Sequence, residues 1–114
     1  MVTERKPITV REFVEALKKN GYPKIRGQYI QYSINKGEIV GACAYGQAAI
    51  NLGIPNNPGH LLGRFSDYLL RSKKWRNNPP NIIYLNDGTD KSVTEIGKIV
   101  EKWAIKMNIM DEEL

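Results

Sequence analysis

The segment RGQYIQYSINKGEIVGACAYGQAAINLG, residues 26–53, decides the fold of this chain. Its first half carries aromatic and β-branched residues, which suit the pleated surface of a strand: Tyr29, Ile30, Tyr32, Ile39 and Val40. Between them stands the turn Asn35-Lys36-Gly37, whose glycine can supply a positive φ. This half of the segment therefore predicts a β-hairpin.

From Ala42 onward the pattern changes to small residues, which predict a helix in close contact with its neighbours. The small residues are Ala44, Gly46, Ala48 and Ala49, and Gly53 stands where helices commonly end. Inside a helix Gly46 costs about 1 kcal/mol relative to alanine, and the close approach of another backbone would offset that cost. We expect this helix to be central, with a cleft at its leading end.

Three further helices are expected around this segment. Two capping boxes, Thr9-x-x-Glu12 and Ser92-x-x-Glu95, predict helices over residues 9–20 and 92–108, each with an apolar stripe at helical spacing. A third apolar face predicts a helix over residues 59–72. Gly97 lies beside the stripe of the last helix and predicts close contact with another helix.

The run NIIYL, residues 81–85, predicts a short third strand or an extended segment, and residues 86–90 predict a turn. Together the patterns predict a small single-domain α+β fold of about four helices packed around one β-hairpin. We expect residues 1–8 to be a flexible lead-in, residues 9–108 to form the globular domain, and residues 109–114 to be an acidic tail.

The composition, 41% hydrophobic and 25% charged, is typical of a soluble globular protein. No apolar run approaches the roughly 18–20 residues that cross a bilayer, and the first residues lack the apolar stretch of a secretory signal. One cysteine cannot form an internal disulfide, which suits a reducing compartment. We therefore expect a cytoplasmic protein with no membrane partner, and the net charge of +5 favours an anionic partner.

Cys43 is the first candidate site residue. It falls at the predicted start of a helix, where free N–H groups can lower the pKa of a thiol. A nucleophilic cysteine also needs a base, and His60 is the only histidine. Since nothing in the spacing pairs the two residues, we interpret Cys43 mainly as a small buried residue. One cysteine and one histidine do not make the usual zinc site.

Asn86 and Asp87 form the second candidate. An amide and a carboxylate on a tight turn can hold a hydroxyl group or the edge of a base. They can equally make Asx turns with their own backbone, and the local pattern favours this second interpretation. The two interpretations are compatible if the turn borders a cleft.

Basic residues with aromatic neighbours form the third candidate. The loop that follows the third predicted helix can grip phosphate and stack a base through Arg71, Lys73, Lys74, Trp75 and Arg76. A solvated loop would look the same, and no known nucleic-acid-binding signature accompanies it. Arg26 and Tyr29 add a second cationic and aromatic pair, in which Arg26 would bind phosphate, cap carbonyl groups or bridge to Asp87.

Several of these features occur in a fixed order: Arg26-Gly27, a hairpin, Cys43-x-x-Gly46, and Asn86-Asp87 before the Ser92-x-x-Glu95 helix. Over residues 9–105 this order resembles a loose group of small uncharacterised phage, prophage and bacterial proteins, which carry an RG…CxxG segment and an ND turn before their last helix. That group often doubles the cysteine and places Leu after it, whereas ACAY stands here at residues 42–45. The resemblance implies an origin and an architecture but no mechanism.

The expected function is that of a non-enzymatic accessory binding protein of phage or prophage origin, acting in the host cytoplasm without a cofactor. It would bind an anionic small molecule or a host protein, for example by sequestering a nucleotide signal in a counter-defence role. The ligand would lie at Arg26, Tyr29, Cys43, Asn86 and Asp87. Two alternatives stay open: nucleic-acid binding through residues 71–76, and a cysteine-dependent enzyme using Cys43. No pattern fixes the oligomeric state.

Overall fold

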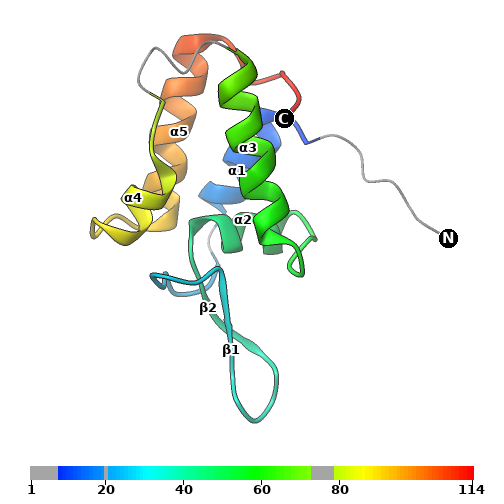
Figure 1. Ribbon diagram of the computed structural model, residues 1–114. Coiled ribbons are helices and arrows are strands. Elements are labelled where there is room, and N and C mark those ends of the chain that lie inside the picture. The colour runs from blue at the N-terminus through cyan, green and yellow to red at the C-terminus, as the bar shows by residue number, and fades with distance from the viewer. Residues whose placement is uncertain (1–7, 20, 73–78) are drawn as a thin grey trace, which may run out of the picture.

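The computed structural model describes residues 8–19, 21–72 and 79–114 (Figure 1). The elements are, in order, α1 Val10–Lys18, β1 Ile30–Tyr32, β2 Ile39–Ala42, α2 Ala44–Asn51, α3 Pro58–Ser72, α4 Ile82–Asp87 and α5 Val93–Met107. The predicted α+β class is confirmed, with five helices rather than about four among the described residues. Residues 1–7 of the predicted lead-in lie outside the described residues. No helix in the described part of the chain is long and apolar enough to cross a membrane.

Helices α1 and α5 lie side by side and begin as predicted (Figure 1). Both capping boxes are formed, since Thr9 and Ser92 each accept a hydrogen bond from the backbone three residues on and each N-cap N–H is bound by the glutamate. Gly97 brings α5 onto the end of α1, because a Cβ there would lie 2.9 Å from the backbone nitrogen of Lys18. The predicted close helix contact at Gly97 is confirmed.

The C-terminal segment closes the fold against the start of α1. Ile109 and Met110 are buried, and the backbone N–H groups of Val10 and Arg11 donate to the carbonyl groups of Glu112 and Met110, at 2.9 and 2.8 Å. These two N–H groups have no partner inside their own helix, so the segment supplies the acceptors that the helix lacks. The predicted acidic tail is therefore docked along its backbone, although the side chains of residues 111–113 are exposed.

Helix α2 occupies the centre, as the small residues predict. Ala44, Ala48 and Ala49 have no exposed surface, and α2 contacts all four other helices. Aromatic rings from three helices meet beside it, with the centroids of Phe13 and Phe65 4.9 Å apart and those of Phe13 and Tyr45 6.0 Å apart. The helix ends as expected near Gly53, whose φ is +79°.

The predicted hairpin is present and projects away from the helices (Figure 1). Its strands pair antiparallel, Ile30 with Ala42 and Tyr32 with Ile39, with an irregular register after Gln31. Gly37 in the turn has the expected positive φ, +66°. The strand that matters for the site is β2, because it runs directly into α2.

The prediction of a strand or extended segment at residues 81–85 was wrong, because α4 occupies this part of the chain. Asn81 is its N-cap, and the Asn81 side chain accepts a hydrogen bond from the N–H of Tyr84 at 3.0 Å. Only Ile82 and Asn86 of this helix are buried, which is the four-residue spacing of one helical face. Since α4 extends to Asp87, the predicted turn begins only at Gly88.

Candidate functional site

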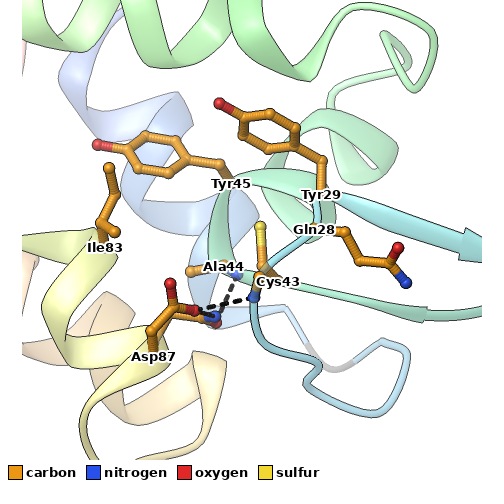
Figure 2. A pocket seen from close by; sticks show the side chains of 9 residues that line it. Gln28, Tyr29, Cys43, Ala44, Tyr45, Ile83 and Asp87 are labelled. Atoms are coloured by element: carbon orange, nitrogen blue, oxygen red, sulfur yellow. Dashed lines mark hydrogen bonds between the residues drawn. The ribbon is translucent and has the colours of Figure 1, made fainter.

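A cavity of about 220 Å³ lies where the segment before β1, the start of α2 and one face of α4 meet; we call it the α2–α4 cavity (Figure 2). It is lined by Gly27, Gln28, Tyr29, Cys43, Ala44, Tyr45, Ile83, Asn86 and Asp87. Pockets for whole drug-sized ligands hold about 300–1,000 Å³. The α2–α4 cavity is therefore sized for one ring system, with the rest of a larger ligand outside it.

Gly46 allows the segment before β1 to lie directly on α2. A Cβ at this position would overlap the carbonyl oxygen of Tyr29 and lie 2.7 Å from its carbonyl carbon. The same carbonyl group accepts a hydrogen bond of 2.9 Å from the N–H of Cys43. The predicted close approach of another backbone at Gly46 is confirmed, and it fixes one wall of the cavity.

Asn86 joins three separate parts of the chain at the base of the cavity. Its side chain is buried, accepts a hydrogen bond from the N–H of Ala44 at 2.9 Å, and donates to the carbonyl oxygen of Ile25 at 2.9 Å and to Asp87 Oδ1 at 2.8 Å. The predicted Asx turn is therefore not what the Asn86 side chain forms. Both donors of its amide are engaged, so Asn86 builds the cavity instead of offering a free group to a ligand.

Asp87 presents an available acceptor to the cavity. Its Oδ1 accepts from Asn86 and, at 3.4 Å, from the N–H of Gly27, while no described residue donates to Oδ2. Figure 2 shows the carboxylate on the side of the cavity opposite the rings of Tyr29 and Tyr45. A carboxylate is acceptor-only when ionised, so Asp87 can take a hydrogen bond from a donor group on a ligand.

Tyr45 adds a polar group that the sequence reasoning missed. The residue is only 5% exposed, and its hydroxyl has no hydrogen-bond partner among the described residues. The hydroxyl points toward Ile83 at the border of the cavity (Figure 2). Burial raises the pKa of Tyr45 well above its ordinary value, so the group stays a neutral hydroxyl. Its place two residues after Cys43, among small residues, was the one available signal.

Cys43 lies at the cavity as the N-cap of α2, and its sulfur accepts a hydrogen bond from the N–H of Gly46 at 3.4 Å. Burial raises the pKa of the Cys43 thiol despite this contact, so the reactive thiolate is disfavoured. His60 does not line the cavity; it lies in the first turn of α3, where its Nε2 accepts from Arg64 Nε at 2.9 Å. The two residues of the cysteine-enzyme alternative are therefore not brought together at this site.

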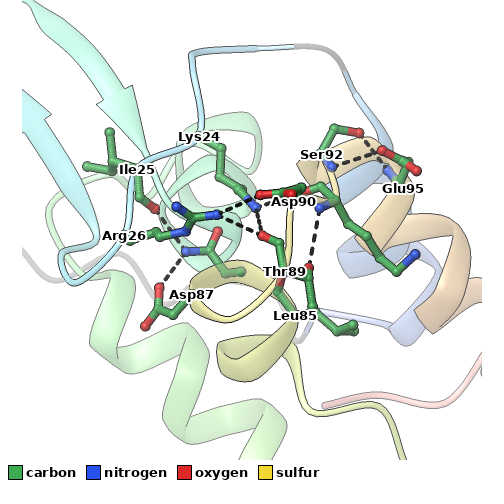
Figure 3. A network of polar contacts seen from close by, with 11 residues as sticks. Lys24, Ile25, Arg26, Leu85, Asp87, Thr89, Asp90, Ser92 and Glu95 are labelled. Atoms are coloured by element: carbon green, nitrogen blue, oxygen red, sulfur yellow. Dashed lines mark hydrogen bonds and ion pairs between the residues drawn. The ribbon is translucent and has the colours of Figure 1, made fainter.

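Arg26 does not line the cavity and belongs to a neighbouring polar network (Figure 3). Its Nη2 donates to the carbonyl oxygen of Thr89 at 3.0 Å and to Asp90 Oδ1 at 3.3 Å. Lys24 Nζ donates to the carbonyl groups of Thr89 and Lys91 at 2.8 and 2.6 Å, and burial together with Arg26 lowers the pKa of Lys24. Of the roles left open for Arg26, the structure shows the capping of a carbonyl group. The ion pair of Arg26 is with Asp90 and not with Asp87.

The basic loop is mostly outside the described residues. Arg71 lies exposed in the last turn of α3, whereas Lys73, Lys74, Trp75 and Arg76 lie beyond the described part of the chain. The nucleic-acid interface predicted there stays a prediction. In the described part of the chain, no group of three or more His, Cys, Asp or Glu side chains could hold a metal ion.

Comparison of this chain with protein-family models, with curated proteins and with solved structures found no match. The resemblance to small phage and prophage proteins therefore stays a prediction. The α2–α4 cavity brings together Tyr29, Cys43, Asn86 and Asp87 from the expected ligand site, and its free polar atoms are the observations from which a function can be inferred.

Proposed function

We propose that this protein is a non-enzymatic binding protein, and that the α2–α4 cavity holds the base of a nucleotide-class small molecule. The observation that carries this proposal is the pair of free polar groups, the Tyr45 hydroxyl and Asp87 Oδ2, which border one cavity. Asp87 is exposed, so solvent reaches its carboxylate, whereas Tyr45 is buried and its hydroxyl has no partner among the described residues. A ligand between Tyr45 and Asp87 would supply both partners.

The walls of the cavity suit a flat heterocycle. The rings of Tyr29 and Tyr45 lie on one side of it (Figure 2), and aromatic side chains contact planar bases favourably. A dry protein cavity of about 150 Å³ can hold benzene, so the 220 Å³ found here can hold one ring system of a base. The sugar and phosphates would lie outside the cavity, where the net charge of +5 attracts an anion.

Binding without catalysis is supported by the state of the two candidate catalytic groups. The Cys43 sulfur is buried with a raised pKa, and His60 is turned to Arg64 in another part of the fold. A cysteine nucleophile needs a thiolate and a nearby base, and the cavity lining supplies no histidine. The resemblance to phage and prophage proteins motivates the biological role that we attach to this proposal, the sequestration of a nucleotide signal in the cytoplasm of a host.

A thermal-shift panel of nucleotides and nucleosides tests the proposal. A ligand at about 100 times its Kd stabilises the folded state by about 2.7 kcal/mol. For a domain of this size that corresponds to a rise in Tm of about 10 °C or more. We expect at least one member of the panel to give such a rise. If no nucleotide, nucleoside or base shifts Tm, the proposal is wrong.

A pair of matched variants locates the ligand. Ile83 is half-exposed at the border of the cavity, so Ile83→Trp should obstruct the cavity and abolish the ligand-dependent shift. Ile105 is similarly exposed on α5 and does not line the cavity, so Ile105→Trp should keep the full shift. An undiminished shift in Ile83→Trp would place the ligand elsewhere.

A further inference from the structure

We infer, on the basis of the proposed function, that the α2–α4 cavity recognises a guanine base through the base's N–H groups and not a phosphate group. Asp87 accepts hydrogen bonds from the base, the Tyr45 hydroxyl donates one to it, and the phosphates stay outside. The inference follows from which polar groups around the cavity are already engaged and which are free.

Four backbone N–H groups around the cavity are engaged within the protein, and the donors left free in the described lining are uncharged side chains, including the Gln28 amide and the Tyr45 hydroxyl. The N–H of Ala44 is bound by Asn86, that of Cys43 by the carbonyl group of Tyr29, and that of Gly46 by the Cys43 sulfur. The N–H of Gly27 faces Asp87 Oδ1. The N–H groups of Ala44 and Gly46 at the start of α2 are thus already bound, so they are not available to hold a phosphate as helix N-termini often do.

The charge at the cavity also opposes a phosphate. Among the residues that the structure describes, Asp87 is the one charged side chain in the lining. Lys24 and Arg26, which precede the lining residue Gly27 in sequence, donate instead to Thr89 and its neighbours (Figure 3). An anion inside the cavity would face the Asp87 carboxylate without a compensating cation. The sequence-based expectation of phosphate binding by Arg26 is therefore replaced by recognition of the uncharged part of a nucleotide.

The free groups at the cavity distinguish one base from another by the donors and acceptors on the edge of each base. Guanine presents two adjacent N–H donors, N1–H and the 2-amino group, beside the O6 acceptor. The free Asp87 Oδ2 can accept from these donors, since Oδ1 already accepts from Asn86 and Gly27, and the Tyr45 hydroxyl can donate to O6. Adenine and cytosine each present a ring nitrogen acceptor beside their amino group, and this acceptor would face the Asp87 carboxylate. Guanine is therefore the base that matches Asp87 and Tyr45 together.

Calorimetric titration with nucleosides tests this inference without a contribution from phosphate. Guanosine should bind, and inosine, which lacks the 2-amino group, should bind about 10- to 100-fold more weakly because a donor to a carboxylate is lost. Asp87→Asn should weaken guanosine binding by a similar factor. The same variant should improve binding of xanthosine, whose 2-oxo group accepts a hydrogen bond from the new amide. A gain for one ligand cannot come from misfolding.

Two conservative variants complete the design. Tyr45→Phe removes only the hydroxyl and should weaken guanosine binding about fivefold, as loss of a neutral hydrogen bond does. Asp90→Asn alters an exposed carboxylate that pairs with Arg26 and does not line the cavity, so guanosine binding should not change.

The outcomes separate this inference from the proposed function. If nucleotides bind but guanosine and inosine bind equally, or Asp87→Asn has no effect, or removal of the phosphate abolishes binding, the inference is overturned while the proposed function stands. Agmatine, a guanidinium compound, is a further probe, and agmatine binding stronger than that of guanosine overturns the inference as well. If no nucleotide, nucleoside or base binds the wild-type protein, the proposed function itself fails.

Discussion

Gly46 and Gly97 each let one segment of the chain lie directly against another, and the two contacts differ in what surrounds them. At Gly97, α5 lies against the end of α1, and polar groups beside the contact bind one another: Thr94 donates to the Lys18 carbonyl oxygen at 3.2 Å, and Lys18 pairs with Glu101 at 2.7 Å. At Gly46, α2 lies against the backbone of Tyr29, and a cavity with free polar groups remains beside the contact.

The difference shows how one small domain can combine a closed core with an open site. The α1–α5 contact joins two regular helices, and their apolar stripes pack against each other. The contact at Gly46 is between a helix start and an irregular segment, joined by single polar bridges such as Asn86. Irregular backbone held by side-chain bridges leaves space, and this space is where we place the ligand.

The first prediction, with the largest expected effect on stability, compares alanine substitutions at the two glycines. Gly46→Ala places a Cβ onto the Tyr29 carbonyl group, which is backbone and cannot turn away, so we expect a loss of about 3 kcal/mol or more in the free energy of unfolding. Gly97→Ala meets atoms of Leu17 and Lys18 at 2.8–2.9 Å and should cost less, about 1–3 kcal/mol. Urea denaturation measures both values.

Gly63 is the matched control for these substitutions. It lies on α3, and a Cβ there would meet nothing within 4 Å. Gly63→Ala should therefore stabilise the protein by up to about 1 kcal/mol, the difference in helix propensity. If Gly46→Ala proved as harmless as Gly63→Ala, the segment around Tyr29 would not be fixed on α2, and the wall of the cavity would be lost with it.

The second prediction compares two asparagines that bridge helices. Asn86→Ala leaves the buried N–H of Ala44 and the carbonyl group of Ile25 without their partner, which should cost about 2–3 kcal/mol. Asn51→Ala, on the α1 side of α2, removes one hydrogen bond to Ala16 from a half-buried side chain and should cost about 1 kcal/mol. Urea denaturation gives both losses, and amide hydrogen exchange at Ala44 should accelerate only in Asn86→Ala. Equal losses would mean that the two sides of α2 are held alike.

The regular part of the fold was predictable because its signals are local. A capping box needs only four consecutive residues, and an apolar stripe only the length of one helix, so α1 and α5 follow from the sequence. The small residues of α2 predicted a central helix for a similar reason. The segment at residues 81–85 was mistaken for a strand because five residues do not define a period, and the capping role of Asn81 was overlooked.

The place of the cavity was predictable from the sequence, but the contacts of its residues were not. The leading end of α2 and the Asn86-Asp87 pair do meet, as expected for a cleft there. The roles of the residues depend on contacts between distant positions, such as Asn86 with Ala44 and Ile25, 42 and 61 residues away. No local pattern encodes such contacts, so the engagement of Asn86 and the remote position of Arg26 could not be inferred. For the same reason, the sequence could not show that the Tyr45 hydroxyl lacks a hydrogen-bond partner among the described residues.

The smallest expected effect concerns the cap of α5, in the closed half of the comparison. Hydrogen bonds from Ser92 lower the pKa of Glu95 below its ordinary value of 4.5. The folded state therefore favours the ionised carboxylate, so the contribution of Glu95 is complete above that value and is lost as the pH falls through the lowered pKa. Glu95→Gln should reduce the loss of stability between about pH 7 and about pH 3, measured as the shift in urea midpoint. Glu38→Gln, at an exposed position of the hairpin turn, should leave that shift as in the wild type. An unchanged pH dependence in Glu95→Gln would show that acid lowers the stability at groups outside the α5 cap.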